Sequence, residues 1–412
     1  MHRTQAPPVF ILGGFQTDFS RNVTREGRTL ADLIRETAQG ALQAAGVAAS
    51  EVEVGHLGNF AGELFVGQGH LGGLLVEADP AFAGLPTSRH EAACASGSVT
   101  ALAAMADLEA GRYDVALVLG VELMRNGTAL EASAKLGAAA WVPEETQGLA
   151  QVWPELFSRV GDEYERRYGL RREHLVAIAR ENFANARRNP NAQTRRWSLD
   201  ADSFEPGSPS NPHVAGRLYK HDCSQVTDGG AAVVLASERF ARAHARRQES
   251  SPSVITGFGH RTSRMALADK LADSQGDAYV FPHVRRAITD AYARAGIEGP
   301  AALDVIETHD CFTTTQYLAI DHFGLTPPGE SWRAIDDGLT AFAGKLPMNP
   351  SGGLMGLGHP VGASGVRMLL DAHKQVTGAA GEYQVNGARR AATLNLGGSA
   401  TTSVCFVVEK DG

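Results

Sequence analysis

The chain has 412 residues, of which 43% are hydrophobic and 20% are charged, and its formal net charge is −8. This balance is typical of a globular protein with a large core, and the scattered arginine pairs of an acidic chain do not form a nucleic-acid surface. No segment approaches the ~18 uninterrupted apolar residues of a membrane span, and the amino terminus lacks an apolar signal region, so we expect a cytoplasmic protein that does not enter membranes.

The first part of the chain alternates short strands with helices. Apolar runs bounded by turn residues predict strands at 9–12, ending near 57–60, at 115–119 and at 231–236. An amphipathic helix over 30–45 ends at Gly46, and a helix of small residues opens at Cys94. Such alternation indicates βαβ units, in which helices cover both faces of a sheet.

The stretch 125–212 interrupts this pattern within the first half. It contains Trp141, Trp153 and Trp197 with charged helical runs, and it ends in a Pro- and Ser-rich segment at 205–212. We interpret it as an inserted loop domain, or cap, which is a common place to bind the bulky part of a substrate.

The last part of the chain repeats the order of the first. It predicts strands at 254–256, 303–308, 392–395 and 403–408, and helices at 284–295 and from Ala363 onward. Local echoes accompany the shared order, because 40–47 resembles 290–297 and Ala95-Ser-Gly-Ser resembles Ala363-Ser-Gly-Val. We therefore predict two similar α/β halves packed face to face, residues 1–124 plus 213–250 and residues 251–412, with matching helices between their sheets.

A glycine-rich loop at 349–365 contains a single histidine, His359. So many glycines allow another group to approach the backbone closely. The loop lacks the Lys-Ser/Thr ending of a P-loop and the strict Gly-x-Gly-x-x-Gly spacing after a strand, so the pattern disfavours a nucleotide site.

Two cysteines and two histidines occupy settings that favour chemistry. Cys94 precedes its small-residue helix where His359 precedes the matching one, so the duplication should bring them together. The start of a helix is expected to lower the pKa of the Cys94 thiol and to hold an oxyanion. His309 and Cys311 follow the strand at 303–308 and share a face if the chain stays extended, with Asp310 opposite. Two thiols with two imidazoles fit acylation of one thiolate and proton transfer by the other.

Other interpretations of these residues are weaker. On residue type alone, Cys94 is more often a buried structural thiol, and its Ala-Cys-Ala-Ser-Gly-Ser setting with a matching histidine reverses that preference. His309 and Cys311 lack a third ligand nearby for a metal. The cysteines show no Cys-x-x-Cys spacing, so no disulfide framework is expected, and we expect Cys223 and Cys405 to be inert.

Five stretches together resemble the thiolase superfamily: Ala93-Cys-Ala-Ser96, residues 225–237, His309-Asp-Cys-Phe312, the glycine-rich loop, and Asn395-Leu-Gly-Gly398. The chain is most similar to the sterol-carrier-protein type. Common thiolases carry Asn-Glu-Ala-Phe in place of the His-Asp-Cys-Phe stretch, and Cys-x-Gly where this chain has Asn395-Leu-Gly397. The resemblance implies a thiolase-like α/β fold, a duplicated five-layer αβαβα arrangement with an inserted loop domain.

The resemblance also implies a role for each site residue. Cys94 would form the acyl enzyme, His359 would activate it, and Cys311 would remove or return the α-proton. His309 and His359 would form one oxyanion hole, and the amides of Cys94 and Gly397 would form the other. The implied reaction is a ping-pong Claisen condensation of an acyl-CoA with acetyl-CoA, or the reverse thiolytic cleavage of a 3-oxoacyl-CoA.

Partners and alternatives follow from the same resemblance. It implies acyl-CoA substrates, no metal or organic cofactor, a homodimer or homotetramer, and in some members a small OB-fold accessory protein. A second hypothesis is a thiolase-fold C-acyltransferase or lyase that acts on a non-CoA acceptor in a specialised pathway, which the tryptophan-bearing cap motivates. A third is a non-catalytic lipid-binding or scaffold member, and the retained Cys94 argues against it.

Overall fold

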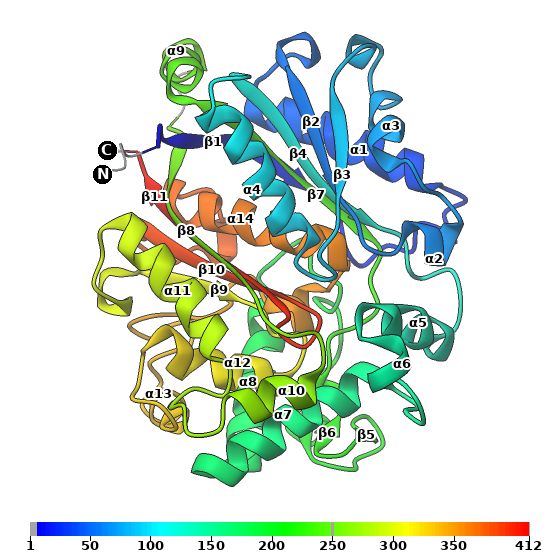
Figure 1. The fold of residues 1–412 in the computed structure, drawn as a ribbon, viewed down its shortest axis with the longest axis vertical. Helices are drawn as coiled ribbons and strands as arrows, with labels where there is room; N and C mark the ends of the chain where they lie inside the picture. Colours follow the sequence, from blue (N-terminus) through cyan, green and yellow to red (C-terminus); the bar gives the residue numbers. More distant parts are fainter. Residues whose placement is uncertain (1–5, 249–250, 412) are drawn as a thin grey trace.

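The computed structural model describes residues 6–248 and 251–411, in which nine strands form one mixed sheet (Figure 1). The strand order is β3-β2-β4-β7-β1-β8-β11-β10-β9. The strands of this sheet are β1 (Val9–Gln16), β2 (Val54–Gly58), β3 (Thr87–His90), β4 (Val115–Glu122), β7 (Gly229–Ser237), β8 (Ser253–Thr262), β9 (Val305–Thr308), β10 (Arg390–Gly397) and β11 (Thr402–Lys410). Each predicted strand is present, and the predicted bounds were too short for most of them.

The sheet consists of one set of strands from each half of the chain. β3, β2, β4, β7 and β1 come from the first half, and β8, β11, β10 and β9 come from the second. The two sets are joined where Val9, Phe10 and Ile11 of β1 pair antiparallel with residues 253–255 of β8. The expected pair of sheets is therefore joined along one short edge.

Helices form three further layers around these strands. The main helices are α1 (Leu30–Ala45), α4 (Ser96–Glu109), α7 (Val152–Tyr168), α8 (Arg172–Ala186), α11 (Pro282–Ala295), α12 (Thr313–Phe323) and α14 (Val361–Thr377). The shorter ones are α2 (Gly62–Val66), α3 (Leu71–Val76), α5 (Ala129–Leu136), α6 (Val142–Glu145), α9 (Glu238–Gln248), α10 (Leu267–Asp273) and α13 (Ser331–Asp336). None of the helices in the described part of the chain has the length and apolar character needed to cross a bilayer.

The central layer is made by α4 and α14. α14, drawn in orange in Figure 1, contacts β4 and β7 of one set and β10 and β11 of the other. Val118 of β4, Ala104 of α4, Leu369 of α14 and Phe406 of β11 belong to one buried cluster. α1 covers the outer face of the first set and α11 that of the second. The layers are therefore helix, sheet, helix, sheet, helix, as expected.

The helix boundaries follow from local chemistry. Thr29 caps α1 by accepting from the backbone of Asp32, whose carboxylate accepts in return from the Thr29 backbone. Gly46 ends α1 in the left-handed conformation that glycine adopts without strain. Gly296 ends α11 in the same way, so both predicted stops are confirmed.

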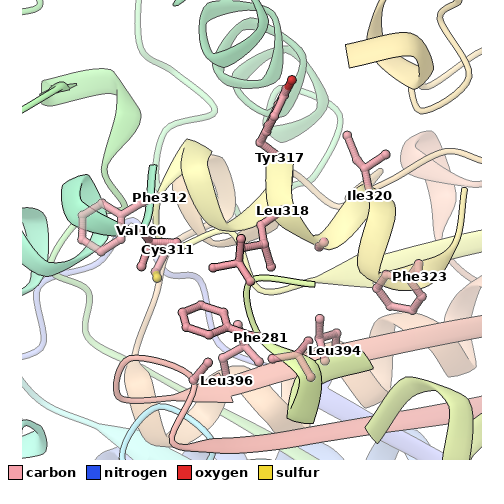
Figure 2. Packing of buried hydrophobic residues seen from close by; sticks show 14 of the residues in the cluster. Val160, Phe281, Cys311, Phe312, Tyr317, Leu318, Ile320, Phe323, Leu394 and Leu396 are labelled. Atoms are coloured by element: carbon pink, nitrogen blue, oxygen red, sulfur yellow. The ribbon is translucent and has the colours of Figure 1, made fainter. Parts of the chain in front are cut away.

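The inserted segment packs mainly on the second half of the chain. Phe157 and Val160 of α7 share a buried cluster with Phe281, Cys311 and Phe312. Figure 2 shows part of this cluster, in which Cys311 and Phe312 lie together with Val160. The rings of Phe157 and Phe312 stack with centroids 4.8 Å apart. The helices inserted into the first half thus support the residues that follow β9. A small hairpin of β5 (His213–Ala215) and β6 (Leu218–Tyr219) follows the segment.

Candidate active site

One cavity of about 300 Å³ is lined by Cys94, His309, Cys311 and His359 together. Cys94 lies just before α4, His359 just before α14, and the other two residues follow β9. The structure therefore brings all four predicted side chains into one place, although 265 positions separate Cys94 from His359 in sequence.

Glycine contacts bring the starts of the two central helices together. A Cβ on Gly97 would lie 2.7 Å from the carbonyl oxygen of Gly362, and one on Gly365 would collide with Ser98. A Cβ on Gly120 of β4 would also collide with Gly362. The Ala-Ser-Gly echo of the sequence thus marks the places where backbone packs on backbone, which is why Cys94 and His359 can face one cavity.

The backbone just before Cys94 is strained. Ala93 has a φ of 51°, a left-handed conformation that is costly for a residue with a Cβ. The Ser96 hydroxyl donates to the Ala93 carbonyl oxygen over 2.6 Å and accepts from the Ala92 amide over 2.9 Å. The Ser96 side chain therefore holds the turn that precedes α4. This strain could not be predicted from the amino-acid sequence, because alanine rarely adopts a left-handed conformation.

His359 is held in the tautomer that acts as a base. Its Nδ1 lies 2.7 Å from the Ser364 hydroxyl, and that hydroxyl donates to the Pro360 carbonyl oxygen over 3.2 Å. Both hydrogen bonds form together only when His359 Nδ1 carries the proton. The Nε2 atom is then unprotonated, and it is buried with no hydrogen-bond partner among the described residues. A lone pair without a partner is what a proton acceptor in this cavity requires.

His309 is held in the opposite tautomer. Its Nδ1 accepts from the backbone N–H of Leu396 over 3.3 Å and lies 3.2 Å from the side-chain amide nitrogen of Asn395. A backbone N–H can only donate, so the proton of His309 is on Nε2. The ring lies edge-on to that of His359, with centroids 5.3 Å apart. One imidazole can therefore donate in the cavity while the other accepts.

Both imidazoles are uncharged at neutral pH. Burial, followed by the positive charge of Arg367, lowers the pKa of His309 to about 3. Burial lowers the pKa of His359 well below its usual value, and His309 and Arg367 act in the same direction. A neutral His359 can accept a proton without first losing one.

The expected lowering of the Cys94 pKa is wrong. Burial, followed by the negative charge of Glu122, raises the pKa of the thiol to about 12, and hydrogen bonds from the Gly398 and Cys94 amides offset only part of this. Burial also raises the pKa of Cys311 well above its usual value, with Cys94 as the next cause. The site at rest thus holds neutral thiols, because desolvation exceeds the effect of the helix start.

Gly397, whose amide was predicted to form an oxyanion hole, is not among the residues that line the cavity, whereas its neighbour Gly398 is. The Gly398 amide donates a hydrogen bond to the Cys94 sulfur, whereas Gly397 packs against the Ala92 carbonyl oxygen.

The two remaining cysteines lie in different places. Cys223 also lines the cavity, and Cys405 is buried in β11. Within the described residues, no three His, Cys, Asp or Glu side chains gather in a metal-binding group.

Two family models together match almost the whole chain. The model "Thiolase, N-terminal domain" matches residues 9–239, and "Thiolase C-terminal domain-like" matches residues 266–410. The chain belongs to the thiolase family.

Relatives of this thiolase carry names from two groups. An "Acetyl-CoA acetyltransferase" of Methanothermobacter thermautotrophicus is 31% identical over 98% of this chain and 99% of its own length. A "Sterol carrier protein 2" of Oryctolagus cuniculus is 29% identical over 95% of this chain and 70% of its own length. The similarity to the sterol-carrier-protein group is the one that the His-Asp-Cys-Phe stretch predicted.

Solved structures show the same fold at lower identity. An "Ltp2-ChsH2(DUF35) aldolase" superposes with a TM-score of 0.77 at 20% identity and covers 99% of each chain. Human mitochondrial 3-ketoacyl-CoA thiolase in complex with CoA superposes with a TM-score of 0.68 at 17% identity and covers all of each chain. The thiolase fold of the present chain is thereby established.

The glycine-rich loop of this thiolase packs closely against α8 and Asp310. A Cβ on Gly352 would lie 2.8 Å from Ala186 Cα, and one on Gly356 would lie 2.6 Å from the Asn182 carbonyl oxygen. A Cβ on Gly353 would collide with the Asp310 carboxylate. The loop lacks side chains at these positions because α8 and Asp310 occupy the space.

Three asparagines on one face of α8 and just beyond its end support this loop. Asn182 donates to Asp310, Asn185 to the Asn349 carbonyl oxygen, and Asn189 to the Ser351 carbonyl oxygen. All three are buried. Sequence reasoning missed them, and the signal was their helical spacing of three and four residues within a charged run.

A buried arginine connects the remaining segments of the site. Arg367 of α14 donates to Glu307 of β9 over 2.9 Å, to Ser351 of the loop over 3.0 Å and to Asp371 over 3.1 Å. The Ser351 hydroxyl donates to Glu307 over 2.6 Å. This network ties β9, the glycine-rich loop and α14 together, and it was not predicted.

The rest of the cavity wall is mainly apolar. Trp153 and Phe157 of α7 lie in it, and the Trp153 ring is fixed by a hydrogen bond to the Leu136 carbonyl oxygen over 2.9 Å. Lys220 and Gln225 add polar groups. The inserted segment therefore contributes directly to the cavity wall.

Proposed function

We propose that this thiolase transfers acyl groups between coenzyme A thioesters through an acyl enzyme at Cys94. The reaction is a Claisen condensation of an acyl-CoA with acetyl-CoA, or its thiolytic reverse. The observation that carries this proposal is the pair of imidazoles in opposite tautomers beside two thiols in a single cavity. The acetyl-CoA acetyltransferase name of relatives at 31% identity supports it.

The first half-reaction uses the base and the nucleophile. The Cys94 sulfur attacks the thioester carbonyl carbon while its proton passes to His359 Nε2. Because neither group is ionised beforehand, proton transfer and attack occur together. Amides at the start of α4 and at Gly397 and Gly398 stabilise the oxyanion. Collapse of this intermediate breaks the C–S bond to coenzyme A, and the proton on His359 leaves with the coenzyme A thiol.

The second half-reaction uses the second thiol. Cys311 first gives its thiol proton to His359 Nε2. The resulting thiolate removes a proton from the methyl group of acetyl-CoA, and the enolate oxygen accepts a hydrogen bond from His309 Nε2–H. His359, when protonated, is a second donor. The new carbanion attacks the acyl carbon on Cys94 and displaces the Cys94 thiolate, which takes the proton from His359. Cys311 keeps the proton that it removed from acetyl-CoA. All proton transfers are made by side chains, so we propose that no metal or organic cofactor takes part.

Intact-protein mass spectrometry tests the acyl enzyme directly. Purified protein mixed with acetyl-CoA or acetoacetyl-CoA should gain the mass of one acetyl group, and peptide mapping should place it on Cys94. Cys94→Ala should gain none, and Cys223→Ala, which removes another thiol of the same cavity, should still be acylated. Absence of any adduct on the unmodified protein across a panel of acyl-CoAs would overturn the proposal.

We also propose a homodimer or homotetramer that works in the cytoplasm, with a small OB-fold protein as accessory partner. The name of the Ltp2-ChsH2(DUF35) aldolase, which combines two components, supports such a partner. Exposed apolar side chains at Leu130, Trp141 and Val142, on and beside α5 and α6, are consistent with a covered surface. Light scattering on the purified chain measures the oligomer, and a monomer would contradict this part.

A further inference from the structure

Asp310 lies between two proposed catalytic residues, yet the mechanism does not use it. Its side chain is completely buried. It does not line the cavity that its neighbours His309 and Cys311 line. An ionisable group in this position needs a reason, because burial of a carboxylate is costly unless its oxygens accept hydrogen bonds.

The carboxylate holds the loop that leads to His359. Asp310 accepts from the Leu354 amide over 2.5 Å and from the Met355 amide over 3.3 Å. These amides belong to a short π-helix at Gly353–Leu357, which ends two residues before His359. The approach is possible because Gly353 has no Cβ and a φ of 60°. Asp310 therefore connects the segment of Cys311 to the segment of His359.

A third hydrogen bond connects Asp310 to the inserted segment. Asn182 of α8 donates to its carboxylate over 2.8 Å and to the Gln316 side-chain oxygen over 2.6 Å. Asn349 also donates to this Gln316 oxygen, over 3.0 Å. Because both neighbours of the Asn182 amide nitrogen are acceptors, its orientation is fixed.

We propose that Asp310 is a positioning residue that fixes Cys311 relative to His359, and that Asn182 holds its carboxylate in place. This inference rests on the proposed function for the roles of Cys311 and His359. It gives the inserted segment a second role, because α8 holds Asp310 and the glycine-rich loop by hydrogen bonds while α7 lines the cavity. The deprotonation and condensation step, which needs Cys311, depends on this link more than acylation of Cys94 does.

The link requires an ionised Asp310. A carboxylate accepts all three hydrogen bonds, whereas a protonated acid must place its proton against one of these donors. Burial raises the pKa of Asp310 to about 6, and Arg367 of α14 acts in the opposite direction with the loop amides. α8 and α12 present only the neutral Asn182 and Gln316 to this site. Condensation should therefore weaken as the pH falls through about 6.

The test compares two asparagine-to-aspartate variants, one within α8 and one just beyond its end. Asn182→Asp places a second carboxylate against Asp310, so the pair shares a proton and the acid limb of the pH profile moves upward. Asn189→Asp adds the same charge beyond the end of the same helix, where its partner is the Ser351 carbonyl oxygen. Condensation rates and Cys94 acylation are measured from about pH 5 to about pH 9, and amide exchange of Leu354 and Met355 is followed by mass spectrometry.

We expect Asn182→Asp to raise the pH of half-maximal condensation by about one unit, with Cys94 acylation reduced less than condensation. The Leu354 and Met355 amides should exchange faster in this variant than in Asn189→Asp. An unmoved acid limb, equal loss of both half-reactions, or an equal shift in Asn189→Asp would overturn the inference. Amide exchange needs no substrate, so it tests the link even if the unmodified protein acylates nothing, a result that would refute the proposed function by itself.

Discussion

Removal of the Ser364 hydroxyl tests the assignment of His359 as the base. In Ser364→Ala, His359 Nδ1–H loses an acceptor 2.7 Å away in a fully buried position. A buried donor left without a partner costs about 1–3 kcal/mol, and the imidazole is free to adopt the tautomer with the proton on Nε2. At about 1.36 kcal/mol per factor of ten, acylation of Cys94 should slow by about 5-fold to about 150-fold.

Single-turnover acylation, followed by intact-protein mass spectrometry after rapid quenching, isolates this step from condensation. Thr377→Ala is the matched control, because Thr377 lies on the same helix and its hydroxyl also donates to the carbonyl oxygen four residues earlier. We expect the control to acylate at the rate of the unmodified protein. If Ser364→Ala also acylates at that rate while remaining folded, the tautomer argument is wrong.

Three further predictions concern the second thiol, the loop and a buried amine. Cys311→Ala should still acquire an acyl group on Cys94 and should form no condensation product, as product analysis by liquid chromatography will show. Gly353→Ala should lower the unfolding temperature by an amount equivalent to at least about 1–2 kcal/mol, because its Cβ meets Asp310 at a positive φ; an unchanged temperature would refute the contact. Burial lowers the pKa of Lys270 to about 7, so between about pH 7 and about pH 10.5 the unfolded chain binds a proton that the folded chain does not. This amine therefore makes stability rise with pH in that window, and thermal unfolding of Lys270→Met should lack that part of the slope.

The inserted segment shows how far local patterns can be interpreted. Its tryptophans and charged helices predicted a cap, and Trp153 does line the cavity. The same segment also carries Asn182, whose partner Asp310 lies 128 positions away. The spacing of the asparagines places them on one face of a helix, but it does not show that this face is buried or which group it meets. The supporting role of α8 was therefore invisible until the fold was known.

The charge state of the site was mispredicted for a related reason. The start of a helix was expected to lower the Cys94 pKa, and that contribution exists in the amide hydrogen bonds to the sulfur. Burial and the nearby Glu122 outweigh it. Desolvation depends on everything packed around a group, so it cannot be estimated from the neighbours of a residue in sequence.

The sequence alone determined the family, the alternation of strands and helices, the duplicated order of the two halves and the four cysteine and histidine side chains that line one cavity. These features are local, because hydrophobic period, helix caps and short motifs are all encoded within a few residues of one another. The tertiary structure alone decided the tautomers of His309 and His359, the neutral state of the thiols and the hydrogen bonds that connect α8 through Asp310 to the glycine-rich loop. Each of these depends on hydrogen-bond partners and burial supplied by distant segments, such as Leu396 for His309, and such contacts exist only once the chain has folded.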